Sequence, residues 1–300
     1  MVLLLLLAFI LGTPSPRTLL NNTTDFSANF HEKCEEMVPK NSAARVSLAA
    51  LVCGTNMQAS PLQKDLLRSS LIHAYVVSGS HLILLDQFFG IFGIPVILRF
   101  LILLLYSFSA GWQAPVVRAL SSWLLLSTKN RFKVFIPADL SVAIAGMICL
   151  ILFPDWWGSL SLILSWCAAL ALSSVGLFRW SSAFAKVFFT QITVFTFMSL
   201  PLWGWGNLHP LSLVFNLMLI PFISFVLLPL AVLSFVFHPL LFLFEHSESL
   251  FSWILAQGTE PVTMTKSSAL PVSTIWMWIL FLHLVIHLIR LKKKQGQDLG

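Results

Sequence analysis

Residues 71–85 read Leu-Ile-His-Ala-Tyr-Val-Val-Ser-Gly-Ser-His-Leu-Ile-Leu-Leu, and the rest of the chain is best interpreted from this stretch. It is apolar enough to enter a bilayer, but its centre holds two histidines and two serines around a glycine: His73, Ser78, Gly79, Ser80 and His81. Polar groups at membrane depth are costly unless they face protein, water or a substrate. The stretch therefore predicts a membrane segment whose polar side chains have a specific use.

The composition is that of a membrane protein. The 300 residues are 57% hydrophobic and only 10% charged, and the mean hydropathy is +0.87. Soluble domains contain about 25% charged residues. We therefore predict an all-α, polytopic membrane protein with about ten transmembrane helices, some of them broken by proline or glycine. The sequence has neither a Walker lysine motif nor a glycine-rich dinucleotide fingerprint, so no cofactor is expected and the energy for any transport must come from elsewhere.

The hydropathy pattern divides the chain into four parts: a hydrophobic anchor at 1–12, an extracytoplasmic loop at 13–68, a membrane domain at 69–291 and a basic cytoplasmic tail at 292–300. The anchor is short for a span, and a signal peptide or the remnant of a longer helix remains open. The loop is polar with little periodicity, which is typical of a loosely ordered segment. The anchor is counted as one span, and the others are expected near Leu71–Gly90, Ile91–Ser109, Gln113–Thr128, Ala138–Phe153, Ser159–Leu177, Phe188–Trp205, Leu211–Phe237, Pro239–Leu255 and Ser273–Leu291.

Lysine and arginine clusters set the expected orientation. They occur at residues 129–133, 179–186 and 290–294. Alternation through the expected spans places all three clusters on one side, and basic residues near span ends mark the cytoplasmic side. Both termini are therefore expected in the cytoplasm and the 13–68 loop outside. Cys34 and Cys53 lie in that loop and would pair in an oxidising compartment, a question that the sequence leaves open.

Four interpretations of the polar cluster are open. A zinc site needs three or four Cys, His or carboxylate ligands, and only Asp86 lies near in sequence. A catalytic pair of Ser78 and His81 lacks an evident orienting carboxylate and oxyanion hole. Hydrogen bonding between packed spans and the lining of a polar permeation path are the other two. We assign no metal ligand and no catalytic residue, and we favour a lining role for His73, Ser78, Gly79 and His81.

Two further positions are candidate contacts for a polar substrate. Arg118 lies in an apolar span shortly after Pro115, where it either snorkels to the outer interface or faces a cavity and meets a phosphate. Asn216 is followed by Pro221 and Pro229. Because proline removes a helix hydrogen bond, we expect helix breaks at all three prolines. The segment from Asn216 onward predicts either a broken helix that lines a path or a kinked packing helix.

The polar cluster also resembles a known signature. His73, Ser78-Gly79 and His81 match the histidines and the Ser-Gly of the sequence His-Leu-Leu-Ala-x-Ser-Gly-Leu-His, with Ser80 in place of the leucine before the second histidine. Further blocks follow in the family's order: Pro115–Ala119, then Asp155–Ser165 without the family's glutamine, then Leu211 to Pro229. From about Ala49 to His238 the chain thus resembles the ComEC-type competence proteins, the inner-membrane DNA channels of transformable bacteria.

The resemblance implies a channel that carries single-stranded DNA into the cytoplasm during natural transformation, located in the inner membrane of a bacterium. It also implies contact with the lipid bilayer and with other competence proteins, including a separate DNA receptor, a nuclease and a cytoplasmic motor, while a homodimer remains open. Full-length members often carry an OB-like domain and a metallo-β-lactamase-like domain. The 13–68 loop is short for the first, and the chain shows no His-x-His-x-Asp-His motif for the second, so we expect the membrane core alone.

Two alternative functions remain open from the sequence. One is an intramembrane transporter or enzyme for a small or lipidic substrate that uses Ser78 and His81. The other is a structural membrane protein that recruits further uptake components.

Overall fold

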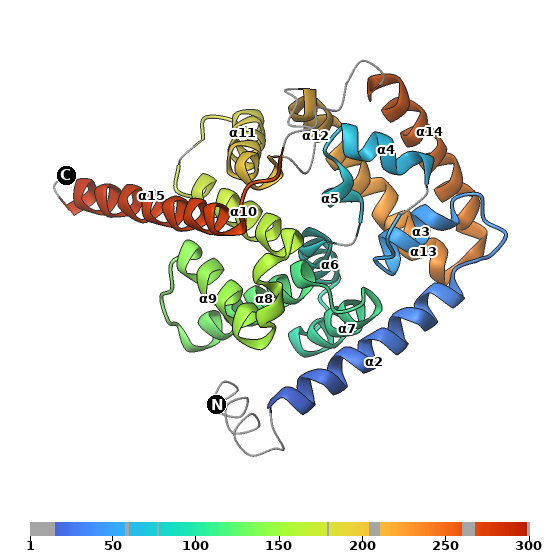
Figure 1. Ribbon diagram of the computed structural model, residues 1–300, viewed down its shortest axis with the longest axis horizontal. Coiled ribbons are helices and arrows are strands. Elements are labelled where there is room, and N and C mark those ends of the chain that lie inside the picture. Colours follow the sequence, from blue (N-terminus) through green and yellow to red (C-terminus); the bar gives the residue numbers. More distant parts are fainter. Residues whose placement is uncertain are drawn as a thin grey trace.

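The computed structural model describes residues 16–57, 60–76, 78–178, 180–203, 211–259 and 268–298, without the side chains of residues 16–21, 73, 130–131 and 294–298. Every regular element in these ranges is a helix, so the expected all-α class is confirmed for the described chain (Figure 1). The anchor expected at 1–12 lies outside the described residues.

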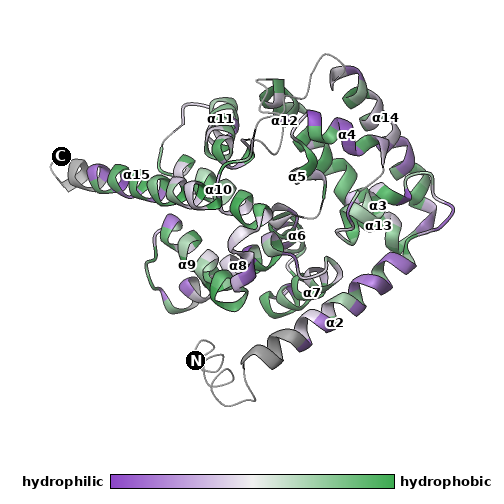
Figure 2. Cartoon of the chain, viewed as in Figure 1, coloured by the Kyte–Doolittle hydropathy of each residue, from purple (hydrophilic) through white to green (hydrophobic). Residues whose placement is uncertain are grey.

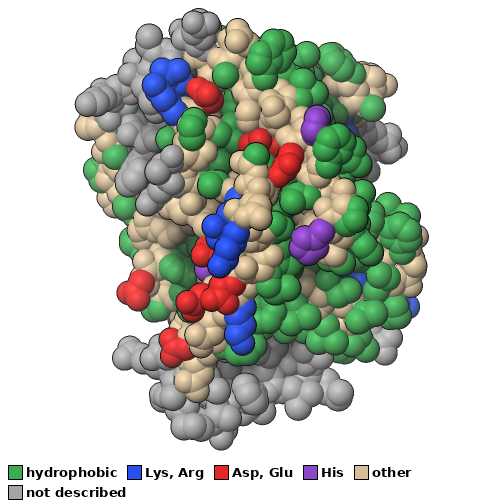
Figure 3. Space-filling view, turned by 90° about the vertical axis from the view of Figure 1, so that its right-hand side faces the viewer, with side chains coloured by type: hydrophobic (Ala, Val, Ile, Leu, Met, Phe, Trp, Pro, Cys, Tyr) green, Lys and Arg blue, Asp and Glu red, His purple; other side chains and the backbone are tan. Residues whose placement is uncertain are grey.

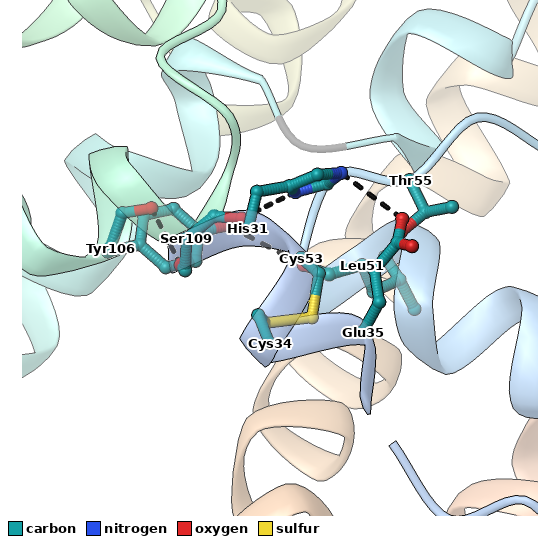
Figure 4. The surroundings of a disulfide bond; sticks show 8 residues. All are labelled: His31, Cys34, Glu35, Leu51, Cys53, Thr55, Tyr106 and Ser109. Carbon is teal, nitrogen blue, oxygen red and sulfur yellow. Dashed lines mark hydrogen bonds and ion pairs between the residues drawn. A yellow bond between two sulfur atoms is a disulfide. The ribbon is translucent and has the colours of Figure 1, made fainter. Parts of the chain in front are cut away.

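The N-terminal region is helical and is cross-linked by a disulfide. It consists of α2 (Pro16–Met37), α3 (Arg45–Val52), α4 (Pro61–Arg68) and the short α5 (Ile72–Tyr75). Cys34 on α2 and Cys53 just after α3 form the disulfide (Figure 4), and both are buried. The expectation of a loosely ordered loop is therefore wrong from residue 16 onward, because buried side chains and the cross-link tie these helices to one core.

The centre of the molecule is a set of packed helices around α6, α8 and α10 (Figure 1). Helix α6 packs on α8, α8 packs on α9 and α10, and α10 packs on α11. One buried cluster holds α6, α7 and α8 together, and a separate one joins α9, α10 and α11 to the C-terminal helix α15 (Val272–Asp298). The bounds of the central elements are α6 (Gly79–Ile91), α7 (Val96–Ser109), α8 (Ala114–Phe132), α9 (Ala138–Leu152), the 3-10 turn η1 (Pro154–Gly158), α10 (Leu160–Val175) and α11 (Ala183–Leu202).

The C-terminal part returns to the N-terminal region before it ends in a long helix. Its elements are α12 (Leu211–Phe222), the π-helical η2 (Ile223–Leu227), α13 (Leu228–Val236), the 3-10 turn η3 (His238–Leu240), α14 (Leu241–Thr259) and α15 (Val272–Asp298). The largest buried cluster joins α12, η2, α13 and α14 to α2–α5. In it, the Tyr75 ring stacks on Phe251 with centroids 5.4 Å apart. The expected outer loop and the membrane domain therefore share a core.

The N-terminal region also meets the turn between α7 and α8 through polar contacts. His31 on α2 donates from Nδ1 to the Ser109 carbonyl at 2.8 Å, a contact drawn in Figure 4. Gln113 Nε2, next to α8, donates to the Gly54 carbonyl at 2.8 Å. Side chains of one region thus satisfy main-chain oxygens of the other, which fixes the disulfide beside the start of α8.

The ten expected spans are not confirmed. In the described chain, three helices are long and apolar enough to cross a bilayer by length and composition: Ala183–Leu202, Leu211–Val236 and Val272–Lys293. Helices 96–109, 138–152 and 160–175 are apolar but shorter. Hydrophobic residues dominate α7 and α12, whereas α2, α4 and α14 carry many hydrophilic ones (Figure 2).

Two of the expected spans do not match the helices of the structure. The span expected at Leu71–Gly90 is divided, because α5 ends at Tyr75 and α6 begins only at Gly79. The span expected at Pro239–Leu255 falls on α14, where Glu245 Oε1 accepts a hydrogen bond from Ser42 and Glu248 Oε1 accepts one from Ser47. Those carboxylates face α3 and the turn before it, so α14 packs on the N-terminal region through polar contacts.

The three prolines do not break their helices. Pro115 lies in the first turn of α8, where the missing N–H has no helical partner to lose. Pro221 lies inside α12, and the π-helical turn η2 follows it, so the wider turn absorbs the lost hydrogen bond and the helix continues. Pro229 falls at the start of α13 in the same continuous rod. Pro115 thus marks the start of a helix, and the α-helical pattern after Pro221 is interrupted by a π-helical turn while the rod continues.

Candidate functional site

The first turn of α6 is built by Ser78 and His81. Ser78 has an extended backbone and acts as the N-cap, and the two residues form a capping box in which His81 takes the place of the usual Glu or Gln. The Ser78 backbone N–H donates to His81 Nδ1 at 3.4 Å, and the opposite nitrogen, Nε2, lies 3.1 Å from the Ala74 carbonyl. Because a carbonyl only accepts, Nε2 carries the proton and Nδ1 is the acceptor. His81 is 1% exposed, so its role is to join α5 to α6.

Gly79 sits against α8 with no room for a side chain. A Cβ atom at this position would lie 2.9 Å from both the Ala119 Cβ and the Pro115 carbonyl oxygen, and 3.6 Å from Arg118 Nη2. The glycine is therefore needed for close packing of helices, and the start of α6 lies next to the guanidinium of Arg118.

Arg118 is a buried cation surrounded by hydroxyl groups. Its side chain projects from α8 and only 5% of the residue is exposed. Nε donates to Ser165 Oγ on α10 at 2.8 Å, and Nη1 donates to Ser122 Oγ at 3.3 Å. Among the described residues, the ion pairs that involve arginine use other arginines, namely Arg68 with Asp65, Arg99 with Asp86 and Arg290 with Asp139.

Within the described chain, the charge of Arg118 is thus solvated by dipoles alone. Serine hydroxyls satisfy N–H groups but supply no negative charge, and a buried charge without a counter-charge is costly. The N-terminus of α6, which carries a partial positive charge, lies beside the guanidinium and increases that cost. The arrangement suits an anion such as a phosphodiester, which would supply the missing charge.

Asn216 and Ser212 form a second polar pair, on α12. Asn216 is 6% exposed and Ser212 is 2% exposed, and they lie one helical turn apart. Within the described part of the chain, neither Asn216 Oδ1 nor Ser212 Oγ has a hydrogen-bond partner. Leaving a buried acceptor unsatisfied costs about 1–3 kcal/mol for each group. This helix therefore carries two polar atoms whose partners are not part of the described fold.

Comparison with known proteins assigns the chain to a family. A family model described as Competence protein matches residues 51–295, which is most of the chain. The protein belongs to the competence protein family. No curated protein and no solved structure matches it. Membership ties this membrane protein to DNA uptake for transformation and to the other components of the competence machinery, and it agrees with the resemblance to ComEC-type proteins.

Within this competence protein, the structure brings only some of the predicted site residues together. Ser78, Gly79 and His81 lie at the start of α6, and Arg118 lies against Gly79. Asn216 belongs elsewhere, since α12 shares its core with α3, α5 and α14. The side chain of His73 lies outside the described residues.

The geometry also bears on the catalytic and metal interpretations. Ser78 Oγ lies 2.6 Å from Ser80 Oγ, while the ring nitrogens of His81 contact the main chain at Ser78 and Ala74. A serine activated by histidine needs a hydrogen bond between the hydroxyl and the ring. Among the described residues, no group of three or more His, Cys, Asp and Glu side chains is placed to hold a metal ion.

Sequence inspection missed three hydroxyl residues of these sites. Ser122 lies four residues after Arg118, and Ser212 lies four before Asn216, so helical spacing alone could have paired them. Ser165 is 47 positions from Arg118 and reaches it only because α8 packs against α10. No local sequence signal identifies a partner at that separation.

Proposed function

We propose that this protein is the membrane core of a channel that passes single-stranded DNA inward across the bacterial inner membrane. The observation that carries the proposal is Arg118, a buried guanidinium held by serine hydroxyls with no carboxylate in its described contacts. In a family tied to DNA uptake, a passing phosphodiester is the anion that would compensate this charge. Ser78, Gly79 and His81 would hold the first turn of α6 in place beside it.

The basic segments support an orientation. Arg290 on α15 pairs with Asp139 at the start of α9, and Lys293 donates to the Leu177 carbonyl just after α10. Lys129, near the end of α8, donates to the Ile136 carbonyl in the loop that leads to α9. Residues of the first and third basic regions therefore lie at one end of the central helices, together with Leu177, which shortly precedes the second. Basic residues at span ends mark the cytoplasmic side.

The opposite end has the features of an outer surface. Trp276 near the start of α15 stacks on Trp157 with centroids 4.8 Å apart and donates from Nε1 to its carbonyl. Gln113 at the start of α8 contacts Gly54, which follows the disulfide. Trp276 and Arg290 are 14 residues apart on one helix, or about 21 Å at 1.5 Å per residue, which is a large part of a bilayer core. Tryptophans favour the interface, and disulfides persist in oxidising compartments.

We therefore propose that the disulfide region lies outside the inner membrane, with both termini in the cytoplasm. Acidic and basic side chains intermingle on the face that Figure 3 shows, over the side of the molecule where α2, α3 and α14 lie. A surface of mixed sign is a poor first receptor for DNA. A separate DNA receptor, a nuclease and a cytoplasmic motor are the expected partners, and a homodimer is compatible with the proposal.

The test is uptake of fluorescent DNA into the cytoplasm of a competent host. A deletion strain is complemented with the wild type, Arg118→Ala, Arg118→Lys, or Arg45→Ala as an exposed basic control on α3, at matched membrane expression. We expect Arg118→Ala to stop entry while DNA accumulates outside, Arg118→Lys to restore part of it, and the control to behave as wild type. Unchanged entry after deletion would overturn the proposal.

Binding by the purified protein gives a second measurement. For single strands, log K falls with log salt, and each lost phosphate contact reduces the magnitude of that negative slope by about 0.7. Arg118→Ala should show this decrease. If binding of single-stranded DNA by the wild type did not depend on salt, the alternative function, a transporter or enzyme for a small or lipidic substrate, would become the better explanation. Labelling of Ser78 by a covalent serine probe would support that alternative.

A further inference from the structure

The two faces of α12 differ sharply in character. Leu211, Val214 and Met218 recur at helical spacing and are exposed, as expected of a lipid-facing stripe. The opposite face is buried and begins with Ser212 and Asn216, followed by Leu219 in the large core cluster. The polar pair therefore points toward protein and away from lipid.

Ordinary helix packing does not explain the two unpaired oxygens. A buried serine in an apolar helix usually donates to a carbonyl one turn earlier, as Ser234 does on α13 by donating to Ala231 O at 3.0 Å. Ser212 is the second described residue of α12, and within the described chain its hydroxyl makes no such bond. Asn216 Oδ1 is likewise without a partner among the described residues, although Asn216 is only 6% and Ser212 only 2% exposed.

The unpaired oxygen of Asn216 selects a hydrogen-bond donor, and the Ser212 hydroxyl can donate or accept. A carboxamide oxygen only accepts, and it carries no charge that would attract or repel a phosphate. Donors that meet it are N–H or O–H groups of a ligand. In a protein that handles DNA, these donors are the amino and imino groups on nucleobase edges, which asparagine side chains commonly contact.

We propose that Ser212 and Asn216 form a contact site for the nucleobases of the transported strand, separate from the phosphate contact at Arg118. This inference rests on the proposed function, because it assumes that single-stranded DNA is the cargo. The two sites contact different groups of the strand: Arg118 contacts its phosphates, and Ser212 and Asn216 contact its base edges.

The test is equilibrium binding to the full chain in lipid nanodiscs, with two fluorescent strands of equal length and equal phosphate number. One strand carries bases and the other consists of abasic sites. Asn216→Leu and Ser212→Ala should weaken binding of the base-bearing strand by about three- to tenfold, the loss typical of one hydrogen bond. Binding of the abasic strand should not change. Ser234→Ala, which removes a satisfied hydroxyl from the same rod, is the matched control.

The outcomes separate the two proposals. If the wild type binds neither strand, the proposed function itself is refuted. A wild type that binds both strands, with variants that weaken both equally or neither, overturns only the nucleobase site; equal weakening would indicate a bridging water or a role in folding. Ser212→Ala removes one oxygen and adds no atoms. Its effect on binding can therefore be measured even if Asn216→Leu disturbs the helix.

Discussion

Removal of the disulfide should loosen α3 by an amount that the chain length defines. The perturbation is the pair of substitutions Cys34→Ala and Cys53→Ala, with alanine chosen because both positions are buried and a serine hydroxyl would be unsatisfied there. The cysteines are 19 positions apart in sequence. For a loop of about that length, the chain-entropy relation gives about 11 cal/mol/K, or about 3.2 kcal/mol at 25 °C.

That free energy corresponds to about a 200-fold increase in the population of the opened state. The assay is amide hydrogen exchange, followed by mass spectrometry, of the peptide that covers α3 in the nanodisc-embedded protein. The amides of Leu48 and Leu51, whose side chains are fully buried, should exchange about two orders of magnitude faster in the double variant. Exchange in α10 should be unchanged, because it belongs to a different core cluster.

Two controls make the test specific. Reduction of the wild type should reproduce the acceleration, and the double variant should not respond to the reductant. Cys167→Ala, which removes a free buried thiol on α10, should leave α3 exchange as in the wild type. If the double variant exchanged within a factor of about three of the oxidised wild type, the cross-link would not limit opening and the reasoning would be refuted.

Three further predictions concern a close helix contact, a helix cap and an ion pair. Gly79→Ala should lower the free energy of unfolding by about 1–3 kcal/mol, because its methyl group would overlap α8, whereas Gly158→Ala, which has open space around it, should have little effect; thermal unfolding compares the two. His81→Ala should cost about 0.5–2 kcal/mol through loss of the cap, and His81→Gln, which restores the standard capping box, should recover part of that loss; equal loss in both variants would contradict the capping role. Arg290→Ala should destabilise the protein more than the double variant that also carries Asp139→Ala, because the single change leaves the buried Asp139 carboxylate unpaired, and a double-mutant cycle that shows no coupling would disprove the ion pair.

The local sequence carries signals for part of the candidate site that the expected spans did not use. A serine cap before an apolar run marks the start of α6 at Ser78 and Gly79, and the proline before Arg118 marks the first turn of α8. These features depend on hydrogen bonds within one turn of a helix, so the neighbouring residues suffice to predict them. The use of His81 as the second member of the capping box is also local, but its unusual residue type concealed it.

Local patterns could not predict the number of membrane spans in the same way, nor that the N-terminal region folds into packed helices. The region from residue 16 to Tyr75 lacks a clear hydrophobic period, yet it supplies much of the largest buried cluster. Its apolar residues come from short helices that each bury a few side chains against α13 and α14. A pattern that is spread over several short segments is invisible to a window that tests one helix at a time.

The sequence by itself determined that this chain is an all-helical membrane protein of the competence family, because composition and local motifs are properties of neighbouring residues. Only the tertiary structure decided the surroundings of its buried polar groups. Arg118 meets Ser165 through the packing of α8 on α10, while Asn216 lies in another cluster altogether. The physical reason is that the energy of a buried charge or amide depends on which distant helices surround it, and that choice is made by the packing of the whole chain.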